Sequence, residues 1–305
     1  PATPSMSMAP SMISWPARSP HTMTSSNPAP LLGAGEVRAL AEKAGVTPTK
    51  KLGQNFVHDA NTVRKIVAAA ALVEGDHVLE VGPGLGSLTL GLLDAGATVT
   101  AIEIDSRLAA LLPQTIATHQ PGGQCTVIEA DAMEVKELPT TPTVLVANLP
   151  YNTAVPIVLH LLRTFPTLRR VLVMVQSEVA ERLAAHPGSK AYGSPSVKAG
   201  WFGLWSVAAP VSRHVFWPIP NVDSLLVAMD ATEPPGDEAL RKIMDELVTH
   251  AFRTRRKMAR GALAEYLGSD VVSEVIEQAG LQPTDRGEAW SVEDFVALAR
   301  VVKAR

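Results

Sequence analysis

The sequence is poor in the residues that build disulfides and metal centres. It has one cysteine, Cys125, in 305 residues, so a disulfide within the chain is impossible and a zinc site built on cysteines is not expected. The eight histidines are scattered without the spacing of metal ligands, and we expect no metal. A lone thiol is typical of a protein from a reducing cytoplasm, where we expect this one to act.

Long apolar runs and an excess of charge are also missing. No run approaches the roughly 18 to 20 apolar residues of a membrane-spanning helix, so we expect no membrane contact. The formal net charge of -3 does not suggest a nucleic-acid ligand. It does not exclude one either, because phosphate binding depends on local patches of charge.

Composition divides the chain into three parts. Residues 1–30 are rich in Pro, Ser and Met without apolar periodicity, and they predict a disordered tail. A larger domain is expected over residues 31–232. After a linker with two prolines, helical periodicity predicts a smaller helical domain over residues 237–305.

The larger domain alternates strand-like and helix-like segments. Strands are expected at 78–81, 98–104, 126–129, 143–147, 170–175, 213–216 and 225–229, and helices at 31–44, 87–95, 155–162 and 177–185 and after Asp59 and Asp105. Such alternation predicts an α/β fold with a parallel sheet covered by helices on both faces. Ligands of these sheets bind at the carboxyl ends of the strands.

A glycine-rich turn follows the first of these strands. Gly82, Gly84 and Gly86 stand where the strand ends and a helix begins, and they let a ligand approach the backbone closely. Ser87 occupies the position where a dinucleotide-binding motif needs its third glycine, and Pro83 removes a backbone donor for phosphate. The turn therefore favours S-adenosylmethionine over NAD.

Acidic residues end the next two strands. Glu103 lies close to the roughly 20-residue spacing at which an acid can bind both ribose hydroxyls of a nucleotide. Asp131 ends the third strand and can accept a hydrogen bond from an adenine amine. A plain surface acid is the alternative for each, but together with the glycine turn they predict a donor pocket.

The fourth strand runs into a polar and aromatic turn over residues 144–151. Asn148 offers a neutral acceptor, Pro150 a stiff backbone and Tyr151 a flat ring, which together suit a planar base with an exocyclic amine. Phe216 can stack on the other side of that base, although core packing explains it equally well. A simple strand-to-helix turn is the alternative for residues 148–151.

Basic residues gather in the helical domain. Arg253, Arg255, Arg256, Lys257 and Arg260 follow one another almost without acids. A solvated face is the common explanation of such a run, but the lack of acids favours a patch that contacts RNA phosphates.

Taken together, the chain resembles the ribosomal RNA adenine dimethyltransferase family, and most closely its bacterial 16S branch. The resemblance covers about residues 50–265, and its marks are 52–56, 80–86, 148–151, 188–193, 196–197, 216–224 and 251–263. Departures from the family pattern in the region expected to contact RNA are Asn221, Met258, Ala259, Gly261 and Ala262.

The resemblance implies a Rossmann-like methyltransferase domain with a small all-helical C-terminal domain. It implies an enzyme that transfers methyl groups from S-adenosylmethionine to N6 of two adjacent adenines in a hairpin near the 3′ end of 16S rRNA. The immature small ribosomal subunit would be its partner, and the enzyme would act as a monomer. By resemblance, Gln54, Asn55 and Val57 line the methionine side of the donor, Gly82 and Gly84 form the turn, Glu103 binds the ribose, Asp131 the adenine, and Asn148, Pro150, Tyr151 and Phe216 hold the target base, with Asn148 also facing the donor.

Three other functions deserve comparison. A 23S rRNA dimethyltransferase of the antibiotic-resistance type is the nearest alternative, and residues 188–193 and the Arg-Arg-Lys run argue against it. An RNA-binding assembly factor would add to the enzyme rather than replace it, because every chemical position is occupied. A dehydrogenase is disfavoured by Ser87.

Overall fold

The structure is a computed structural model that describes residues 31–48, 54–254 and 256–305. The expected tail over 1–30, the family residues Leu52 and Gly53, and Arg255 lie outside the described residues. The strands are β1 (Phe56–Val57), β2 (His77–Val81), β3 (Thr98–Glu103), β4 (Cys125–Glu129), β5 (Val144–Asn148), β6 (Arg170–Gln176), β7 (Gly203–Val211), β8 (Phe216–Trp217) and β9 (Ser224–Ala231). The α-helices are α1 (Ala34–Lys43), α2 (Ala60–Ala70), α3 (Ser87–Asp94), α4 (Ser106–His119), α5 (Ala154–Thr164), α6 (Ser177–Leu183), α7 (Ser194–Gly200), α8 (Glu238–Arg253), α9 (Ala259–Leu267), α10 (Val272–Gln278) and α11 (Val292–Lys303).

The large sheet has the strand order β4-β3-β2-β5-β6-β9-β7. Strands β2 to β6 are parallel, as expected from the alternating pattern. One edge of the sheet differs from the expected parallel arrangement, because β9 runs antiparallel to both β6 and β7. Strands β7 and β9 are joined by residues 212–223 without a crossover helix, and such a connection brings the chain back in the opposite direction.

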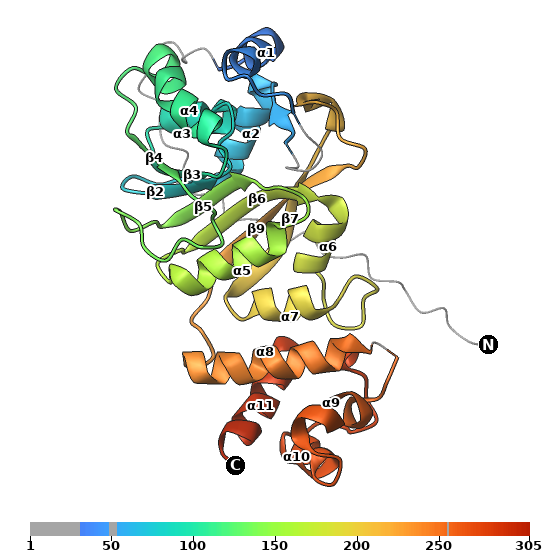
Figure 1. The fold of residues 1–305 in the computed structure, drawn as a ribbon. Helices are drawn as coiled ribbons and strands as arrows, with labels where there is room; N and C mark the ends of the chain where they lie inside the picture. Colours follow the sequence, from blue (N-terminus) through green and yellow to red (C-terminus); the bar gives the residue numbers. More distant parts are fainter. Residues whose placement is uncertain (1–30, 49–53, 255) are drawn as a thin grey trace, which may run out of the picture.

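Helices cover both faces of the sheet (Figure 1). Successive side chains of a strand point to opposite faces, and in β5 Val144 and Val146 join one core cluster while Leu145 and Ala147 join the other. The first cluster packs against α1 to α4, and the second packs against α5 and α6. Burial on both faces explains why β5 is an uninterrupted apolar run.

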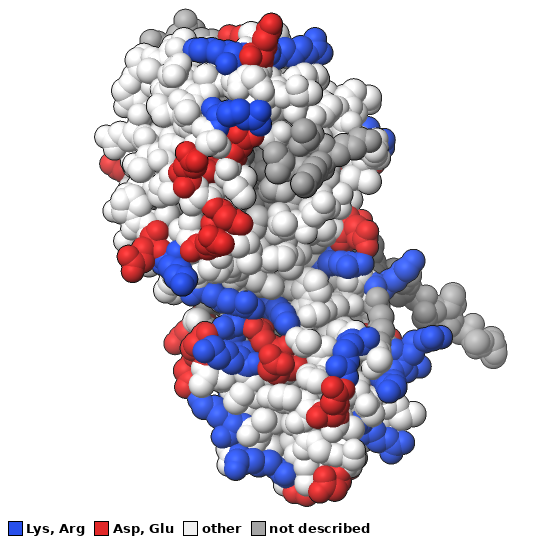
Figure 2. Space-filling view, viewed as in Figure 1, with Lys and Arg blue, Asp and Glu red and all other residues white. Residues whose placement is uncertain are grey.

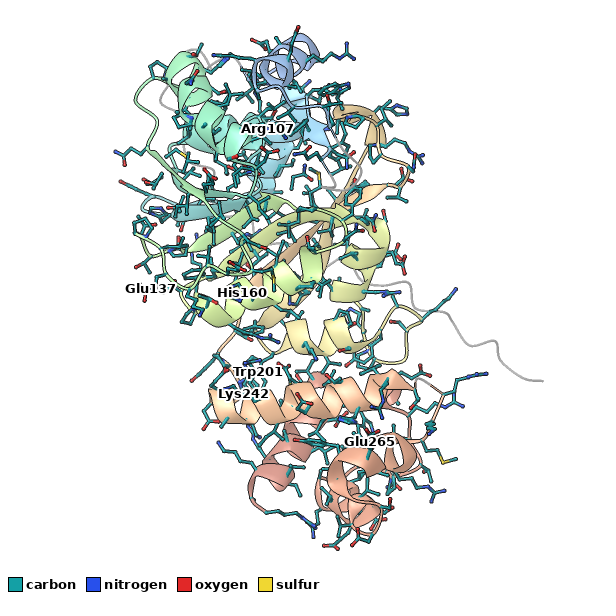
Figure 3. All side chains as sticks on the ribbon, viewed as in Figure 1. Arg107, Glu137, His160, Trp201, Lys242 and Glu265 are labelled. Carbon is teal, nitrogen blue, oxygen red and sulfur yellow. The ribbon has the colours of Figure 1, made fainter. Side chains whose placement is uncertain are left out.

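Helices α8 to α11 form a separate layer below the sheet in the view of Figure 1. They share a third hydrophobic cluster, and that cluster also includes Tyr192 and Trp201 beside α7. The Tyr192 hydroxyl donates to the carbonyl oxygen of Trp290 over 2.8 Å. Trp201 lies between the sheet-containing part and α8 (Figure 3). The domain boundary expected between residues 232 and 237 stays a prediction, since the helical core reaches back to α7.

Some local sequence signals are confirmed by the structure, and others are wrong. The Asp59 side chain caps α2 by accepting from the Thr62 amide over 2.6 Å, and Ser291 forms a capping box at the start of α11. The expected strand over 213–216 is wrong in its first three residues, which form a 3₁₀ turn. Strand β7 was not expected, because exposed and buried residues alternate irregularly along it.

No helix among the described residues is both long enough and apolar enough to cross a membrane.

Candidate active site

A cavity of ≈ 280 Å³ opens at the carboxyl ends of β2, β3 and β5. Its wall contains every residue that the sequence assigned to the donor pocket, together with one from the target-base turn: Gln54, Asn55, Val57, Gly82, Gly84, Glu103, Asp131, Asn148 and Pro150. These residues come from segments almost a hundred positions apart, and the strand order brings them to one edge of the sheet. Their roles toward a ligand stay predictions.

The glycine turn between β2 and α3 forms the floor of this cavity. Gly84 has φ +58°, a backbone conformation that side chains with a Cβ rarely adopt. A Cβ at this position would lie 2.9 Å from the ring of Phe56. The Gly84 amide donates to Oε2 of Glu103 over 3.0 Å. Glycine is therefore required both by the turn and by the packing of Phe56 over it.

Two buried carboxyl groups stand side by side in the wall. Burial raises the pKa of Glu103, while hydrogen bonds from the Asp105 and Gly84 amides oppose the rise. Burial raises the pKa of Glu80 to about 8, although the Thr89 hydroxyl donates to its carboxylate over 2.7 Å. The charge of Glu103 also disfavours ionisation of Glu80 and adds to the rise in its pKa. The sequence marked Glu80 only as part of the glycine motif, because burial cannot be recognised from one residue.

Asp105 connects this wall to the start of the cavity-lining segment at Gln54. Its carboxylate accepts from the Arg107 side chain, which holds its pKa below the usual range, and from Gln54 Nε2 over 3.4 Å. Arg107 also donates to the carbonyl oxygen of Gly45 over 3.0 Å, and Figure 3 shows it between α4 and α1. Asp131, on the opposite side, accepts from the Met133 amide over 2.8 Å.

Asn148 is oriented by its neighbour across the cavity. Its side-chain Nδ2 donates to the backbone carbonyl of Asn55 over 3.0 Å. This contact uses the amide nitrogen, so the amide oxygen is the atom that can accept a hydrogen bond from a ligand. The Pro150 carbonyl already accepts from the Thr153 amide over 3.3 Å and keeps one lone pair.

Tyr151 and Phe216 do not line the cavity. Tyr151 is half-buried, and its hydroxyl lies 2.9 Å from the Ser224 hydroxyl. Phe216 is 1% exposed and belongs to the first core cluster. Its position agrees with the core-packing interpretation, and stacking on a base would require its ring to be uncovered.

A short ribbon joins the donor side to the target-base side. Strands β1 and β8 pair antiparallel, and the rings of Phe56 and Trp217 stack with centroids 6.3 Å apart. The Ser87 hydroxyl donates to the carbonyl of Val57 over 2.6 Å, which ties β1 to α3. Residues 54–57 showed no clear pattern in the sequence because their partner strand lies about 160 positions later, as their register with β8 shows.

Exposed apolar residues of the cavity wall were missed. Ile104 is 61% exposed and Met133 is 39% exposed, and both line the cavity. Each follows a strand-end acid, Glu103 or Asp131, by one or two positions. The sequence signal that could have identified these two cavity residues is an apolar residue one or two positions after a strand-end acid.

The basic residues of the helical part are partly neutralised. Arg253 forms an ion pair with Glu265, and Figure 3 shows Glu265 beside α8. Arg256, Lys257 and Arg260 are exposed. On the face shown in Figure 2, basic and acidic side chains both lie over the lower helices and over the upper part, and several basic ones line the boundary above α8. Within the described ranges, no group of three or more His, Cys, Asp or Glu side chains forms a metal site.

Solved structures define the class of the molecule. The chain is similar to the 23S rRNA methyltransferase ErmE, with a TM-score of 0.62 and 26% identity over 82% of this chain and 100% of that one. It also has the fold of a dimethyladenosine transferase from Plasmodium falciparum, with a TM-score of 0.67 and 23% identity over 80% of this chain and 95% of that one. Fold and site define a Rossmann-like methyltransferase, which confirms the predicted fold class.

The chain belongs to the ribosomal RNA adenine dimethylase family, whose model matches residues 46–303. A relative from Leifsonia xyli, called ribosomal RNA small subunit methyltransferase A, is 57% identical over 88% of this chain and 98% of its own length. A relative of the same name from Corynebacterium efficiens is 54% identical over 90% of this chain and 97% of its own length. The predicted family is confirmed, and this protein is an rRNA adenine dimethyltransferase.

Proposed function

We propose that the protein dimethylates N6 of two adjacent adenines in a hairpin near the 3′ end of 16S rRNA, with S-adenosylmethionine as the methyl donor. The observation that carries this proposal is the identity of 51% or more to proteins called small subunit methyltransferase A over nearly their whole length. The substrate would be the immature small subunit in the cytoplasm, and the enzyme would act as a monomer without a metal.

The cavity fits this donor chemically. Among the described residues that line it are the acids Glu80, Glu103 and Asp131, and none of these described residues is Lys, Arg or His. The carboxylates of Glu103 and Asp131 would disfavour the phosphates of a dinucleotide, whereas a sulfonium ion would find a favourable potential beside them. Glu103 can accept from ribose hydroxyls, and the backbone of Gly82 and Gly84 permits close approach. When bound, the donor supplies an electrophilic methyl group.

Asn148 would orient the nucleophile. An adenine amine is weakly nucleophilic because its lone pair is delocalised into the ring. The Asn148 amide oxygen and the carbonyl of Leu149 or Pro150 would accept its two hydrogens and aim the nitrogen at the methyl group. The amine becomes acidic as the new nitrogen–carbon bond forms, so no strong base is required.

The basic surface would hold the RNA. Arg256, Lys257 and Arg260 are exposed beside α9 and can contact phosphates, and Arg253 and Arg255 extend the same run. Phosphate contacts would fix the position of the hairpin without reading its sequence. Tyr151 would stack on the flipped adenine, and Phe216 would join it only if its ring were uncovered.

The proposal is tested by incubating the protein with methyl-labelled S-adenosylmethionine and immature small subunits, then mapping the modified nucleotides. Label on N6 of two adjacent adenines of 16S rRNA is the expected result. Label on cytosine, or on no RNA at all, would refute the proposal. Free 23S rRNA and large subunits serve in parallel reactions, and label confined to them would identify the 23S alternative, whose structural relative is ErmE.

A further inference from the structure

Ser224 lies outside the cavity wall but is connected to the target-base turn. It begins β9, and it pairs with Gln176 at the end of β6 and with Val211 at the end of β7. Its side chain is 1% exposed. Its hydroxyl oxygen lies 2.9 Å from the hydroxyl of Tyr151, a residue 73 positions earlier in the chain. Ser224, at the start of β9, therefore contacts the aromatic residue Tyr151 in the turn after β5.

The contact restrains the ring of Tyr151 at both ends. The turn after β5 fixes the backbone of Tyr151, and Ser224 fixes its hydroxyl, so the two side-chain torsions have little freedom. Burial raises the pKa of Tyr151, which keeps its hydroxyl protonated and able to donate at neutral pH. The backbone of Ser224 is held in place by strand pairing on both sides, with Gln176 of β6 and Val211 of β7.

Ser224 also disfavours movement of the ring. Among the described residues, no side chain other than that of Tyr151 forms a hydrogen bond with the Ser224 hydroxyl. Rotation of Tyr151 away from β9 would leave a buried hydroxyl unpaired, which is unfavourable. The backbone carbonyl of the neighbouring Asp223 accepts from the Ser177 amide over 3.0 Å, and the Asp223 carboxylate forms an ion pair with Arg213. The end of the loop that leads into β9 is therefore anchored as well.

We propose that Ser224 is a positioning residue for methyl transfer, which holds the Tyr151 ring at the orientation in which it stacks on the target adenine. Ser224 touches neither donor nor base and acts through Tyr151 alone. The inference rests on the proposed function, in which Tyr151 contacts the flipped base.

The test is a double-mutant cycle of Ser224→Ala and Tyr151→Phe, with kcat and KM measured for RNA and donor. Each single variant should lower kcat about 3- to 10-fold, the range for one neutral hydrogen bond, while the KM for the donor stays unchanged. The double variant should be no slower than the slower single variant, because both changes remove the same contact. Thermal melting separates this effect from stability, since a purely structural role would lower the melting temperature and leave kcat per folded enzyme intact.

Ser206→Ala is the matched control, because Ser206 lies on the neighbouring strand β7 and should leave kcat unchanged. Wild-type kcat in Ser224→Ala or Tyr151→Phe, or a double variant whose loss is the product of the single losses, would overturn the inference. Tyr151→Phe leaves the sheet untouched and decides the matter even if Ser224→Ala folds poorly. Failure of the proposed function shows separately, as a wild-type enzyme that methylates no RNA.

Discussion

At the scale of single residues, a hydrogen bond to the Asn55 carbonyl fixes the orientation of the Asn148 side chain. Its amide nitrogen donates to the Asn55 carbonyl, so its amide oxygen is the atom that remains to accept a hydrogen bond. The sequence predicted a neutral acceptor at this strand end, and the structure adds the partner that fixes which atom accepts. An orienting acceptor suits a weak nucleophile better than a base would.

We predict that Asn148→Ala lowers kcat roughly 100-fold or more, because it removes a hydrogen bond made to the reacting amine. Donor binding should remain measurable by calorimetry. Asn152→Ala is the matched control, since Asn152 also lines the cavity but has no assigned contact with the base. Full activity of Asn148→Ala would contradict the role given to this side chain.

A second residue-scale prediction concerns the buried acid Glu80. Its pKa is raised by burial to about 8 from 4.5, so the folded state binds a proton that the unfolded state has lost. Wild-type stability should therefore fall as the pH rises from about 4.5 to about 8, by at most about 1.4 kcal/mol per pH unit from this group. Glu80→Gln cannot ionise and should lack this loss.

Urea unfolding at pH 5 and pH 8 measures the effect as the stability difference between Glu80→Gln and wild type. The difference should shift in favour of Glu80→Gln at pH 8. Glu181→Gln, at an exposed position of α6, is the control. A difference that is the same at both pH values would show that Glu80 is ionised in the folded protein.

At the scale of elements, the β1–β8 ribbon and the glycine turn depend on each other. Phe56 of β1 packs over Gly84, and Ser87 of α3 binds the Val57 carbonyl. The ribbon thereby places Asn55 against Asn148. Sequence patterns predicted the glycine turn but not the ribbon, because a strand of two residues has no periodicity.

We predict that Gly84→Ala weakens donor binding at least tenfold, because the new Cβ strains the turn and displaces Phe56, which lies 2.9 Å away. Calorimetric titration of the donor measures this change. Gly75→Ala is the matched control, since Gly75 also has positive φ, at +85°, but nothing lies within 4 Å of a Cβ there. Both variants should lose about 1 to 3 kcal/mol of stability from backbone strain, and only Gly84→Ala should lose affinity. If the Gly84→Ala and Gly75→Ala variants bind the donor with equal affinity, the position of Phe56 on β1 does not affect donor binding.

At the scale of the whole molecule, helices α8 to α11 form a layer below the sheet that carries the cavity (Figure 1), and acidic and basic side chains both cover this layer (Figure 2). The net charge of the chain, -3, does not reveal the local run of exposed bases Arg256, Lys257 and Arg260. Ion pairing reduces the effective patch, because Arg253 is already matched by Glu265.

We predict that Lys257→Ala and Arg260→Ala each weaken RNA binding and lower the steepness of its salt dependence by about 0.7 to 0.9 per lost phosphate contact. Arg253→Ala should have a smaller effect because Glu265 competes with phosphate for it. Binding of the RNA hairpin across a series of salt concentrations measures both quantities. Lys65→Ala, on α2, is the control, and an equal loss there would show that charge acts without regard to position.

The sequence by itself determined the parallel strands β2 to β6, the glycine turn and the strand-end acids. These signals are local: a run of buried residues, a turn that needs glycine, and an acid at a fixed spacing after it. Every predicted donor residue, from Gln54 to Asn148, consequently lines one cavity. The sequence alone also distinguished the glycine turn from a dinucleotide-binding motif, because Ser87 stands where that motif needs glycine and Pro83 removes a backbone donor.

Only the tertiary structure decided what depends on distant partners. The antiparallel edge of β7 and β9, the ribbon that fixes Asn55 and the burial of Glu80 and Phe216 all depend on contacts across the fold. The hydroxyl contact between Tyr151 and Ser224 is of the same kind. A residue's neighbours along the chain set its local conformation, whereas its burial and its hydrogen-bond partner are set by segments that the sequence does not place beside it.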